Sequence, residues 1–506
     1  ALKTTRAAAL LGAVLFTIIP YRTSYVVEFN MQLCFGLVLF LFFLVRYFQK
    51  PCAAYAAGIA VAWWLQASSE LYQAVFLVLV LPFIVLPLIS ERWSLLKSRR
   101  EFWIPVLVAV AIAGFLTAIF LLPYMSLLQT HTLERSLVEV ERHCLEVFSY
   151  LLNQSRYGIR IPVDAKHDEM SVYPTLCLGI LSLLALVYSL IRHLRSGESK
   201  IKSVARLARL GLILIFLIVS ALTYFKGLHH GREHLLSLLP VLICFASLVV
   251  TALPSRETLE NRMVEGLFSG ALFAFFMGLG PYIEFRHSGS KAINLVYMVL
   301  YHYLDELHGF RVVSRFSVFV MIFIVVIAAV FYSEMQRKWP TKRWLGFLWM
   351  PLILLVALES VPSPFRTRPV DLPLKSAVLD RLDKLDSPYV IAMAPMGSRD
   401  YDSVNMLQIA GVDRLFVYAW GGTYPPYTKA VQEAISGRTT NPEKTEALLR
   451  QLWPECFILE DKFFAAKMKH QVNYTETFST IADCIDQDDR FSLLKLKPPA
   501  PSRENR

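Results

Sequence analysis

The chain has 506 residues, of which 55% are hydrophobic and 18% are charged. Its formal net charge of +11 would suit a protein that binds nucleic acid by neutralising phosphates. The distribution excludes that class of partner, because the apolar residues form long blocks and the basic residues gather between them. A large soluble core could mimic one or two such blocks, but not a long series of them.

Apolar blocks recur over the first 361 residues. About eleven of them are candidates for helices that cross the roughly 30 Å hydrocarbon layer of a bilayer. They lie at residues 7–21, 30–48, 52–67, 70–90, 103–123, 172–191, 208–224, 235–253, 263–281, 312–332 and 344–361. The sequence therefore predicts an α-helical polytopic membrane protein over residues 1–361.

Basic residues between these blocks set the predicted orientation. The basic stretches lie at residues 46–50, 92–100, 192–209, 256–262 and 337–343, and they alternate with the other connections without a break. The positive-inside rule places them in the cytoplasm together with Lys3 and Arg6. We therefore expect a cytoplasmic N-terminus. The opposite, extracytoplasmic side then holds residues 22–29, 67–70, 124–171, 225–234, 282–311 and everything after 361.

Two of the predicted outer loops are long. Loop 124–171 contains HTLERSLVEVERHCLEVFSYLL (131–152), whose apolar residues form a helical stripe opposite a charged face. That pattern is typical of a helix lying along the membrane surface. Loop 282–311 contains KAINLVYMVLYHYLDELHGF, which we expect to form a short re-entrant or interfacial helix.

Arg311 and Arg315 stand four residues apart at the head of block 312–332. On a helix they would share a face, on the side of the membrane where positive charge is usually sparse. A planar guanidinium suits bidentate binding of phosphate, and an ionised group at membrane depth suggests function. The alternative is that these side chains only reach toward lipid headgroups.

Three further outer residues are candidates for binding. Arg22 follows the first block and has the same two interpretations as Arg311 and Arg315. Glu70, in the tight turn QASSELYQ, could position a sugar hydroxyl or cap the next helix. Arg232 lies in FKGLHHGREH, where two adjacent histidines would point in different directions on a helix, which favours solvated surface over a metal site. No spacing resembles a zinc site, and a divalent cation is left open as a cofactor.

After residue 361 the composition changes. Residues 362–374 are a proline-rich linker whose prolines break a helix. Strands predicted in PYVIAMAP, RLFVYAW, ECFILED and RFSLLKL alternate with predicted helices, so residues 375–496 indicate a small extracytoplasmic α/β domain. Residues 497–506 are expected to be a disordered tail. A bridge between Cys456 and Cys484 in this domain stays open.

Several segments, in chain order, resemble pieces of bacterial GT-C type glycosyltransferases. They are TTRAAALLGAVLFTIIPYR, LYQAVFLVLVLPF after a tight turn, ERSLVEVERHCLEVFSYLL, GFRVVSRFSVFV and ALLRQLWPECFILED. The resemblance implies transfer of a sugar from a polyprenyl-phosphate carrier on the extracytoplasmic face of the bacterial inner membrane. It also implies that Arg311 and Arg315 hold the carrier phosphate, and that an acidic residue of the first outer loop acts as base.

In that family the first transmembrane helix and its acidic loop precede the segment that matches Thr4 to Arg22. The resemblance therefore implies a catalytic acid upstream of Ala1, and neither Glu28 nor Glu70 is assigned that role. One alternative is a non-catalytic membrane subunit or scaffold, whose arginines hold membrane lipids and whose outer domain binds a protein partner. Another is a transporter or flippase for lipid-linked saccharides, which the scarcity of charge within the blocks disfavours.

Overall fold

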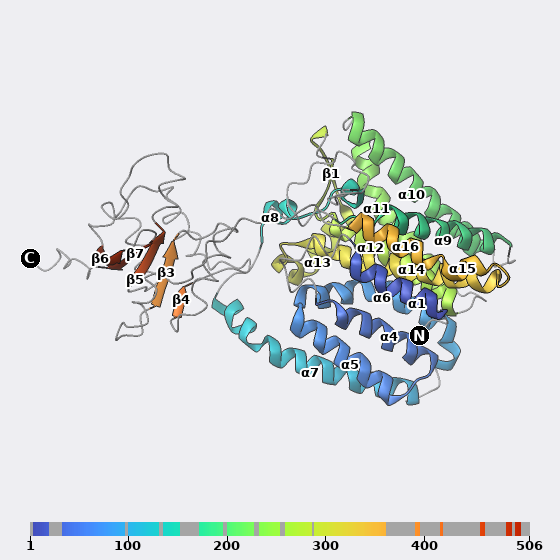
Figure 1. The fold of residues 1–506 in the computed structure, drawn as a ribbon, viewed down its shortest axis with the longest axis horizontal. Helices are drawn as coiled ribbons and strands as arrows, with labels where there is room; N and C mark the ends of the chain where they lie inside the picture. The colour runs from blue at the N-terminus through green and yellow to red at the C-terminus, as the bar shows by residue number, and fades with distance from the viewer. Residues whose placement is uncertain are drawn as a thin grey trace, which may run out of the picture. The chain divides into compact units, whose positions relative to one another are not determined.

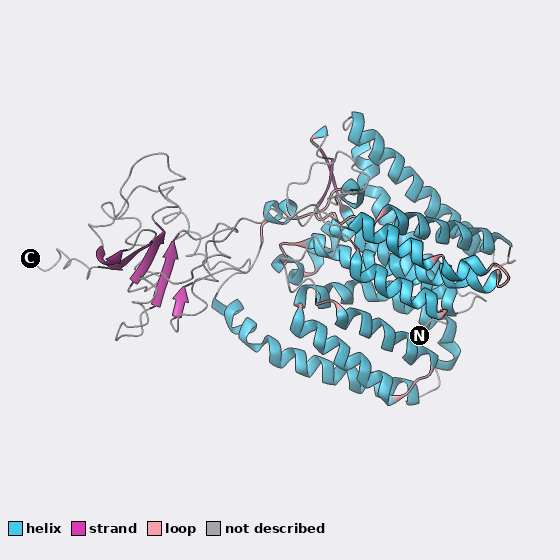
Figure 2. Ribbon diagram, in the orientation of Figure 1, coloured by secondary structure: helices cyan, strands magenta, loops and turns pink. Residues whose placement is uncertain are grey.

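The computed structural model describes most of the first 360 residues and short segments of the remainder. The described ranges are 4–19, 33–96, 100–130, 135–151, 172–195, 200–226, 232–253, 259–285, 288–360, 390–394, 415–417, 456–460, 482–487 and 491–496. The chain divides into two compact units, Ala1–Phe365 and Arg366–Arg506. The helices belong to the first unit and a five-stranded sheet to the second (Figure 2).

The described part of the first unit is mostly helical (Figure 1). Its longer helices are α1 (Arg6–Ile18), α4 (Phe35–Gln49), α5 (Ala53–Ser69), α6 (Leu71–Leu96), α7 (Arg100–Thr130), α9 (Leu176–Arg195), α10 (Lys200–Lys226), α11 (Arg232–Ala252), α12 (Leu259–Gly278), α14 (Ser317–Lys338) and α16 (Trp349–Ser360). Each predicted apolar block coincides with one of them, except that the last is shared between α16 and the short α15 (Arg343–Phe347).

Among the described helices, 5 are long and apolar enough to cross a membrane. They belong to α6, α7, α10, α11 and α14. Burial differs widely among them, from 83% of the apolar window of α14 to 11% of that of α7. Accordingly, α14 packs among α1, α9 and α12, whereas α7 lies at the margin beside α5 (Figure 1). The described architecture is that of a helical membrane protein.

Two glycines let α12 approach its neighbours closely. A Cβ atom added at Gly266 would lie 2.8 Å from Cγ of Pro87 and 2.9 Å from the carbonyl oxygen of Phe83, both on α6. One added at Gly270 would lie 2.9 Å from the ring of Phe323 on α14. Small residues at such contacts allow helix backbones to pack tightly where no hydrophobic effect drives association. Through them α12 joins α6 to α14.

The segment between α12 and α14 is compact. Strands β1 (Tyr282–Phe285) and β2 (Ser290–Ile293) form an antiparallel hairpin, followed by α13 (Leu295–Tyr303) and two 3₁₀ helices, η4 (Asp305–Gly309) and η5 (Val313–Phe316). The side-chain amide of Asn294 donates to the carbonyls of Phe276 and Gly280, at 2.7 and 2.8 Å, and ties the hairpin to the end of α12. The short helix predicted here is α13, whereas the hairpin was not predicted.

The prediction of a single surface helix over 131–152 is wrong, because the helix is interrupted in the middle of this range. Residues 131–134 and 152 lie outside the described residues, and the rest forms α8 (Leu137–Arg142) and a 3₁₀ helix, η1 (Val147–Leu151). Between them the backbone turns toward α12, where the amide of Leu145 donates to the carbonyl of Gly278 at 3.0 Å. Gly280 has φ +67°, and a Cβ atom there would clash with Sγ of Cys144. This close packing replaces the helical stripe.

The basic stretch 192–209 is predicted as a loop, but where it is described it is helical. Because α10 begins at Lys200, the side chains of Lys202, Arg206 and Arg209 belong to its first turns and are buried. Their spacing places them on one face of the helix, while Ile201 and Val204 on the other face are 71% and 63% exposed. Arg262 is likewise a buried residue of α12.

The second unit contains a sheet in the order β4-β3-β5-β7-β6. The strands are β3 (Val390–Ala394), β4 (Leu415–Val417), β5 (Cys456–Glu460), β6 (Ala482–Gln487) and β7 (Phe491–Leu496). The first three pair in parallel, and β7 is antiparallel to both β5 and β6. Four of the strands coincide with predicted ones, and β6 was not predicted. The helices predicted in this unit, the linker and the tail lie outside the described residues.

The sheet places Cys456 and Cys484 on different strands. Cys456 on β5 pairs in register with Lys495 of β7, and Cys484 on β6 pairs with Leu494 of the same strand. Since β7 separates them, their Cα atoms are two strand spacings apart, about 10 Å. A disulfide requires Cα atoms within about 7 Å. The backbone pairing therefore gives the bridge no support.

Candidate functional site

Arg315 and Glu70, both predicted as binding residues, lie in contact although 245 positions separate them. Nη1 of Arg315 donates to Oε1 of Glu70 at 3.3 Å. Arg315 belongs to η5, immediately before α14, and Glu70 is the single residue between α5 and α6. Their side chains are 12% and 5% exposed. The structure thus joins two candidates that no pattern in the sequence pairs.

The backbone of Glu70 is fixed by both helices that meet there. Its amide donates to the carbonyl of Gln66 at 2.8 Å, and its own carbonyl accepts from Ala74 at 3.3 Å. The buried side chain of Gln66 is also bonded on both of its polar atoms. Its Nε2 donates to Oε1 of Gln73 at 3.1 Å, and its Oε1 accepts from the backbone amide of Leu37 at 3.1 Å. This chain of hydrogen bonds ties the turn to α4. The carboxylate contacts Arg315.

An aromatic cluster supports the guanidinium of Arg315. Its Cζ atom lies 5.1 Å from the ring centroid of Tyr72, within the range of a cation–π contact. Tyr72 packs edge-on against Phe310 at 4.6 Å, and Phe76 stacks on Phe316 at 3.8 Å. These rings come from α6 and from both sides of Arg315 in the chain. They fix η5 against α6.

Arg311 does not share a helix face with Arg315, which corrects the prediction made from their spacing. The helix α14 begins only at Ser317, Arg315 lies in a 3₁₀ helix with three residues per turn, and Arg311 precedes that helix. Instead, Nη1 of Arg311 lies 4.0 Å from Oε1 of Glu139, which also binds Arg135 at 3.2 Å. The side chain of Arg311 is 28% exposed, so it is more accessible than Arg315.

Hydrogen bonds between the segment before α8 and the segment that carries α13 and η4 hold Arg311 near Glu139. The amide of Arg135 donates to the carbonyl of His308 at 2.8 Å, and the hydroxyl of Tyr301 donates to the carbonyl of Arg135 at 3.3 Å. The imidazole of His308 packs on the ring of Tyr301 at 4.1 Å. Both arginines therefore stand on a segment that is anchored on two sides.

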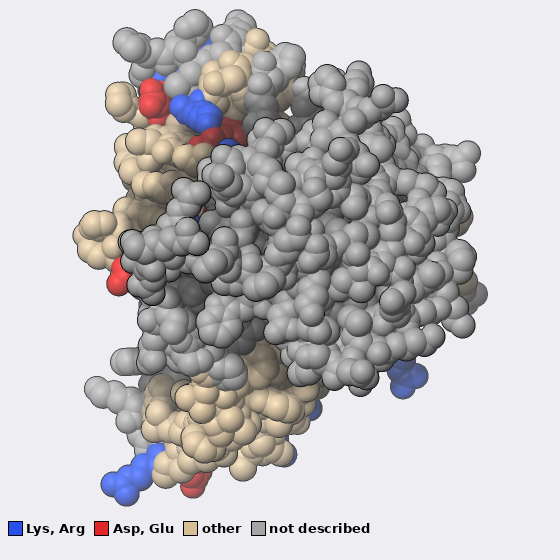
Figure 3. All heavy atoms as spheres, turned by 90° about the vertical axis from the view of Figure 1, so that its left-hand side faces the viewer, with Lys and Arg blue, Asp and Glu red and all other residues tan. Residues whose placement is uncertain are grey.

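A second group of charges lies on the hairpin. Nζ of Lys291 on β2 contacts the carboxylate of Glu141 on α8, and it lies 3.2 Å from Oε1 of Glu284 on β1. The hydrogen bond to Glu141, with a smaller contribution from Glu284, raises the pKa of Lys291. Positive and negative side chains are neighbours on this side of the molecule (Figure 3). The group fastens the hairpin to α8 through these ion pairs.

The remaining predicted residues are Arg22 and Arg232. Arg22 lies outside the described residues. Arg232 is the half-buried first residue of α11, a different helix from those that carry Glu70 and Arg315. Within the described ranges, no group of three or more His, Cys, Asp or Glu residues could hold a metal ion.

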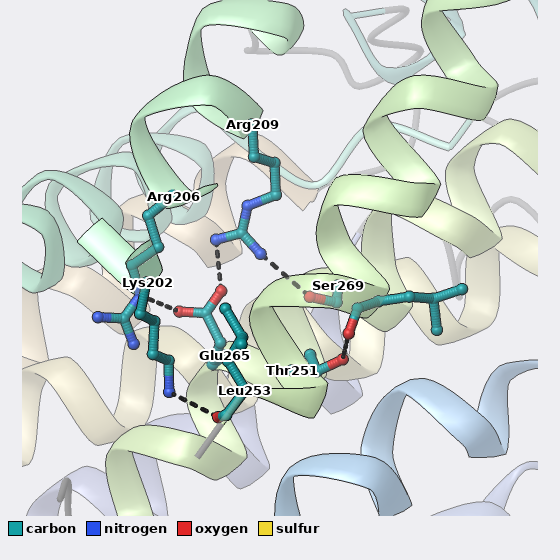
Figure 4. A network of polar contacts seen from close by, with 8 residues as sticks. Lys202, Arg206, Arg209, Thr251, Leu253, Glu265 and Ser269 are labelled. Carbon is teal, nitrogen blue, oxygen red and sulfur yellow. Dashed lines mark hydrogen bonds and ion pairs between the residues drawn. The ribbon is translucent and has the colours of Figure 1, made fainter. Parts of the chain in front are cut away.

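Sequence reasoning missed a buried polar network between α10 and α12 (Figure 4). Nε of Arg206 donates to Oε2 of Glu265 at 3.2 Å, and Arg209 contacts the other oxygen of the same carboxylate. Arg209 also donates to the hydroxyl of Ser269 at 3.1 Å, and Nζ of Lys202 lies 3.4 Å from the carbonyl of Leu253. The spacing of the basic residues, with Glu265 and Ser269 four apart on α12, was the signal available.

This network binds helices together and is closed to a ligand. The side chains of Arg206, Arg209 and Glu265 are 3%, 5% and 8% exposed. The guanidinium of Arg209 also covers the ring of Phe268 at 4.8 Å. From the same helix α12, Arg262 donates to the hydroxyl of Ser90 on α6 at 3.1 Å. Of the two arginine clusters, the one around Arg315 is therefore the candidate functional site.

No protein-family model and no curated protein matches this chain. A proposal for its function therefore depends on the geometry around Arg315 and on the resemblance of several sequence segments to GT-C type glycosyltransferases.

Proposed function

We propose that this protein is a membrane glycosyltransferase of the GT-C type, which transfers a sugar from a polyprenyl-phosphate carrier on the extracytoplasmic face of the bacterial inner membrane. In this proposal about eleven helices cross the membrane. The N-terminus is cytoplasmic, and the second unit is extracytoplasmic. The observation that carries the proposal is the placement of Arg315, a nearly buried guanidinium at the end of a long apolar helix, supported by the ring of Tyr72 and in contact with Glu70.

The chemistry explains why a guanidinium belongs there. When the bond between the anomeric carbon and the phosphate oxygen breaks, its electron pair stays on the phosphate, whose negative charge increases. A cation held in a place of low dielectric stabilises that charge in the transition state. The acceptor oxygen forms the new bond to the anomeric carbon and gives its proton to a base. Arg315 takes the first role, Arg311 assists it, and the base is not assigned to any described residue.

The proposal is tested by turnover of a lipid-linked sugar. The full chain would be reconstituted in nanodiscs and supplied with a panel of decaprenyl-phosphate sugars, with release of free decaprenyl phosphate as the measured product. We expect Arg315→Ala to lower the rate about a hundredfold or more, the usual effect of removing a group that stabilises transition-state charge. Lys291→Ala is the matched control, because that cation is held by the ion pairs of the hairpin, and its rate should equal that of the unmodified protein.

An unchanged rate in Arg315→Ala would contradict the assignment. If no sugar of the panel is released while the lipid phosphate still binds, the catalytic part of the proposal is wrong. The protein would then be a lipid-binding subunit of a larger complex.

A further inference from the structure

The guanidinium that the proposed function assigns to a lipid phosphate already contacts a carboxylate. Carboxylate and phosphate oxygens are the two groups that an arginine fork binds best, and they require the same donors. We infer that Glu70 is an intramolecular competitor for Arg315, which occupies the guanidinium until a lipid phosphate displaces it. This inference rests on the proposed function and adds to it a device that keeps the site closed in the absence of substrate.

The geometry allows this exchange to take place in the side chain alone. Glu70 has its backbone held by Gln66 on one side and Ala74 on the other, so the turn between α5 and α6 stays in place. Rotation about the side-chain bonds of Glu70 is enough to withdraw the carboxylate. Arg315 is held independently by Tyr72 and by the packing of Phe316 against Phe76, so it remains in position when the carboxylate leaves.

Charge gives the device its selectivity. A neutral lipid offers nothing to replace the ion pair, whereas a phosphate supplies an anion that the guanidinium can bind through two parallel hydrogen bonds. Because Arg315 is 12% exposed and Glu70 only 5%, the approach to the pair lies on the side of the guanidinium. The class of ligand is therefore a phosphate ester carried by a membrane lipid, and Glu70 raises the concentration at which it binds.

The test compares the affinity of the purified full chain for decaprenyl phosphate with that of variants, in nanodiscs of neutral lipid. We expect Glu70→Gln to bind about tenfold more tightly, which corresponds to about 1.4 kcal/mol. Arg315→Ala should lose the binding. Decaprenol, which lacks the phosphate, is the ligand control, and inorganic phosphate distinguishes a lipid headgroup from the free ion. Glu284→Gln is the matched protein control, since it removes another nearly buried carboxylate from a different ion pair.

Each result decides a separate point. Equal affinities in the unmodified protein and in Glu70→Gln, both lost in Arg315→Ala, would overturn the inference and leave the proposed function standing. Absence of binding in both would overturn the proposed function itself. Equal binding of inorganic phosphate would overturn the lipid as ligand. If Glu70→Gln does not fold, as judged by its melting temperature, Glu70→Asp takes its place. The carboxylate of that variant is withdrawn by one methylene, and a smaller gain in affinity is expected.

Discussion

Arginine forms ion pairs with glutamate in two regions of this molecule, and the arginine side chains of the two regions differ in their exposure to solvent. At the turn between α5 and α6, Glu70 contacts Arg315, which stands at the end of α14 beside an aromatic ring and keeps 12% of its side chain exposed. Between α10 and α12, Glu265 contacts both Arg206 and Arg209, whose side chains are at most 5% exposed. The same residue types therefore serve helix packing in one region and leave a cation within reach of a ligand in the other.

The difference has an energetic consequence. Removing a carboxylate that two buried guanidinium groups share leaves both cations without that partner. An uncompensated buried charge lowers stability strongly. The arginine side chain that Glu70 contacts is more exposed than those of Arg206 and Arg209, so water or another anion can take the place of the carboxylate there. Stability should therefore depend strongly on Glu265 and less on Glu70.

The comparison is tested most strongly by Glu265→Ala. We expect the free energy of unfolding in mixed micelles to fall by about 3–5 kcal/mol, because Arg206 and Arg209 lose a shared buried partner. Glu265→Gln, which keeps the shape and one acceptor oxygen, should lose less. If Glu265→Ala unfolds at the same denaturant concentration as the unmodified protein, the network does not hold α10 to α12.

Glu70→Ala should have a smaller effect on the same measurement. We expect a loss of about 1–3 kcal/mol, the cost of leaving a hydrogen-bonding group of Arg315 without this acceptor. Gln73→Ala, which removes the acceptor of Gln66 in the first turn of α6, would separate the ion pair from the local packing of the glutamines. A loss as large as that of Glu265→Ala would show that the two regions are equally closed and would remove the basis for distinguishing them.

Arg311→Ala should have the smallest effect on folding. Its guanidinium lies 4.0 Å from Glu139 and is partly solvated, and ion pairs of that kind contribute about 0–1 kcal/mol. Arg135→Ala is a useful companion, because Arg135 binds the same carboxylate at 3.2 Å. A loss above about 2 kcal/mol in Arg311→Ala would mean that this residue supports the fold, and it would weaken the role proposed for it beside Arg315.

The sequence predicted the helices well because long apolar blocks are a strong signal that each segment carries by itself. It misplaced Lys202, Arg206 and Arg209, because basic residues near a block are read as loop residues, and only packing against Glu265 makes their place in a helix favourable. It also placed Arg311 and Arg315 on one helix face, although the chain enters α14 through a 3₁₀ helix. That entry is fixed by the aromatic packing of Phe310 and Phe316 on α6.

The candidate site was predicted residue by residue but not as a pair. Glu70 and Arg315 were each selected for their charge near the outer end of a block. Their contact depends on how α5, α6 and α14 pack, which local patterns in the sequence do not determine. The same limit applies to the break after α8, which exists because Leu145 and Cys144 fit against the glycines at the end of α12.

The proposal for Arg315 depends first on the side of the membrane that it faces, which labelling from outside the cell measures directly. Tyr303→Cys, at a position 76% exposed on α13, and Trp344→Cys, at a position 60% exposed after the basic stretch 337–343, would each be treated with a membrane-impermeant maleimide. Labelling above that of the parent protein is expected only at Tyr303→Cys in intact cells, and at both after the cells are opened. Labelling of Trp344→Cys alone in intact cells would place Arg315 and Glu70 on the cytoplasmic side and contradict the proposed function.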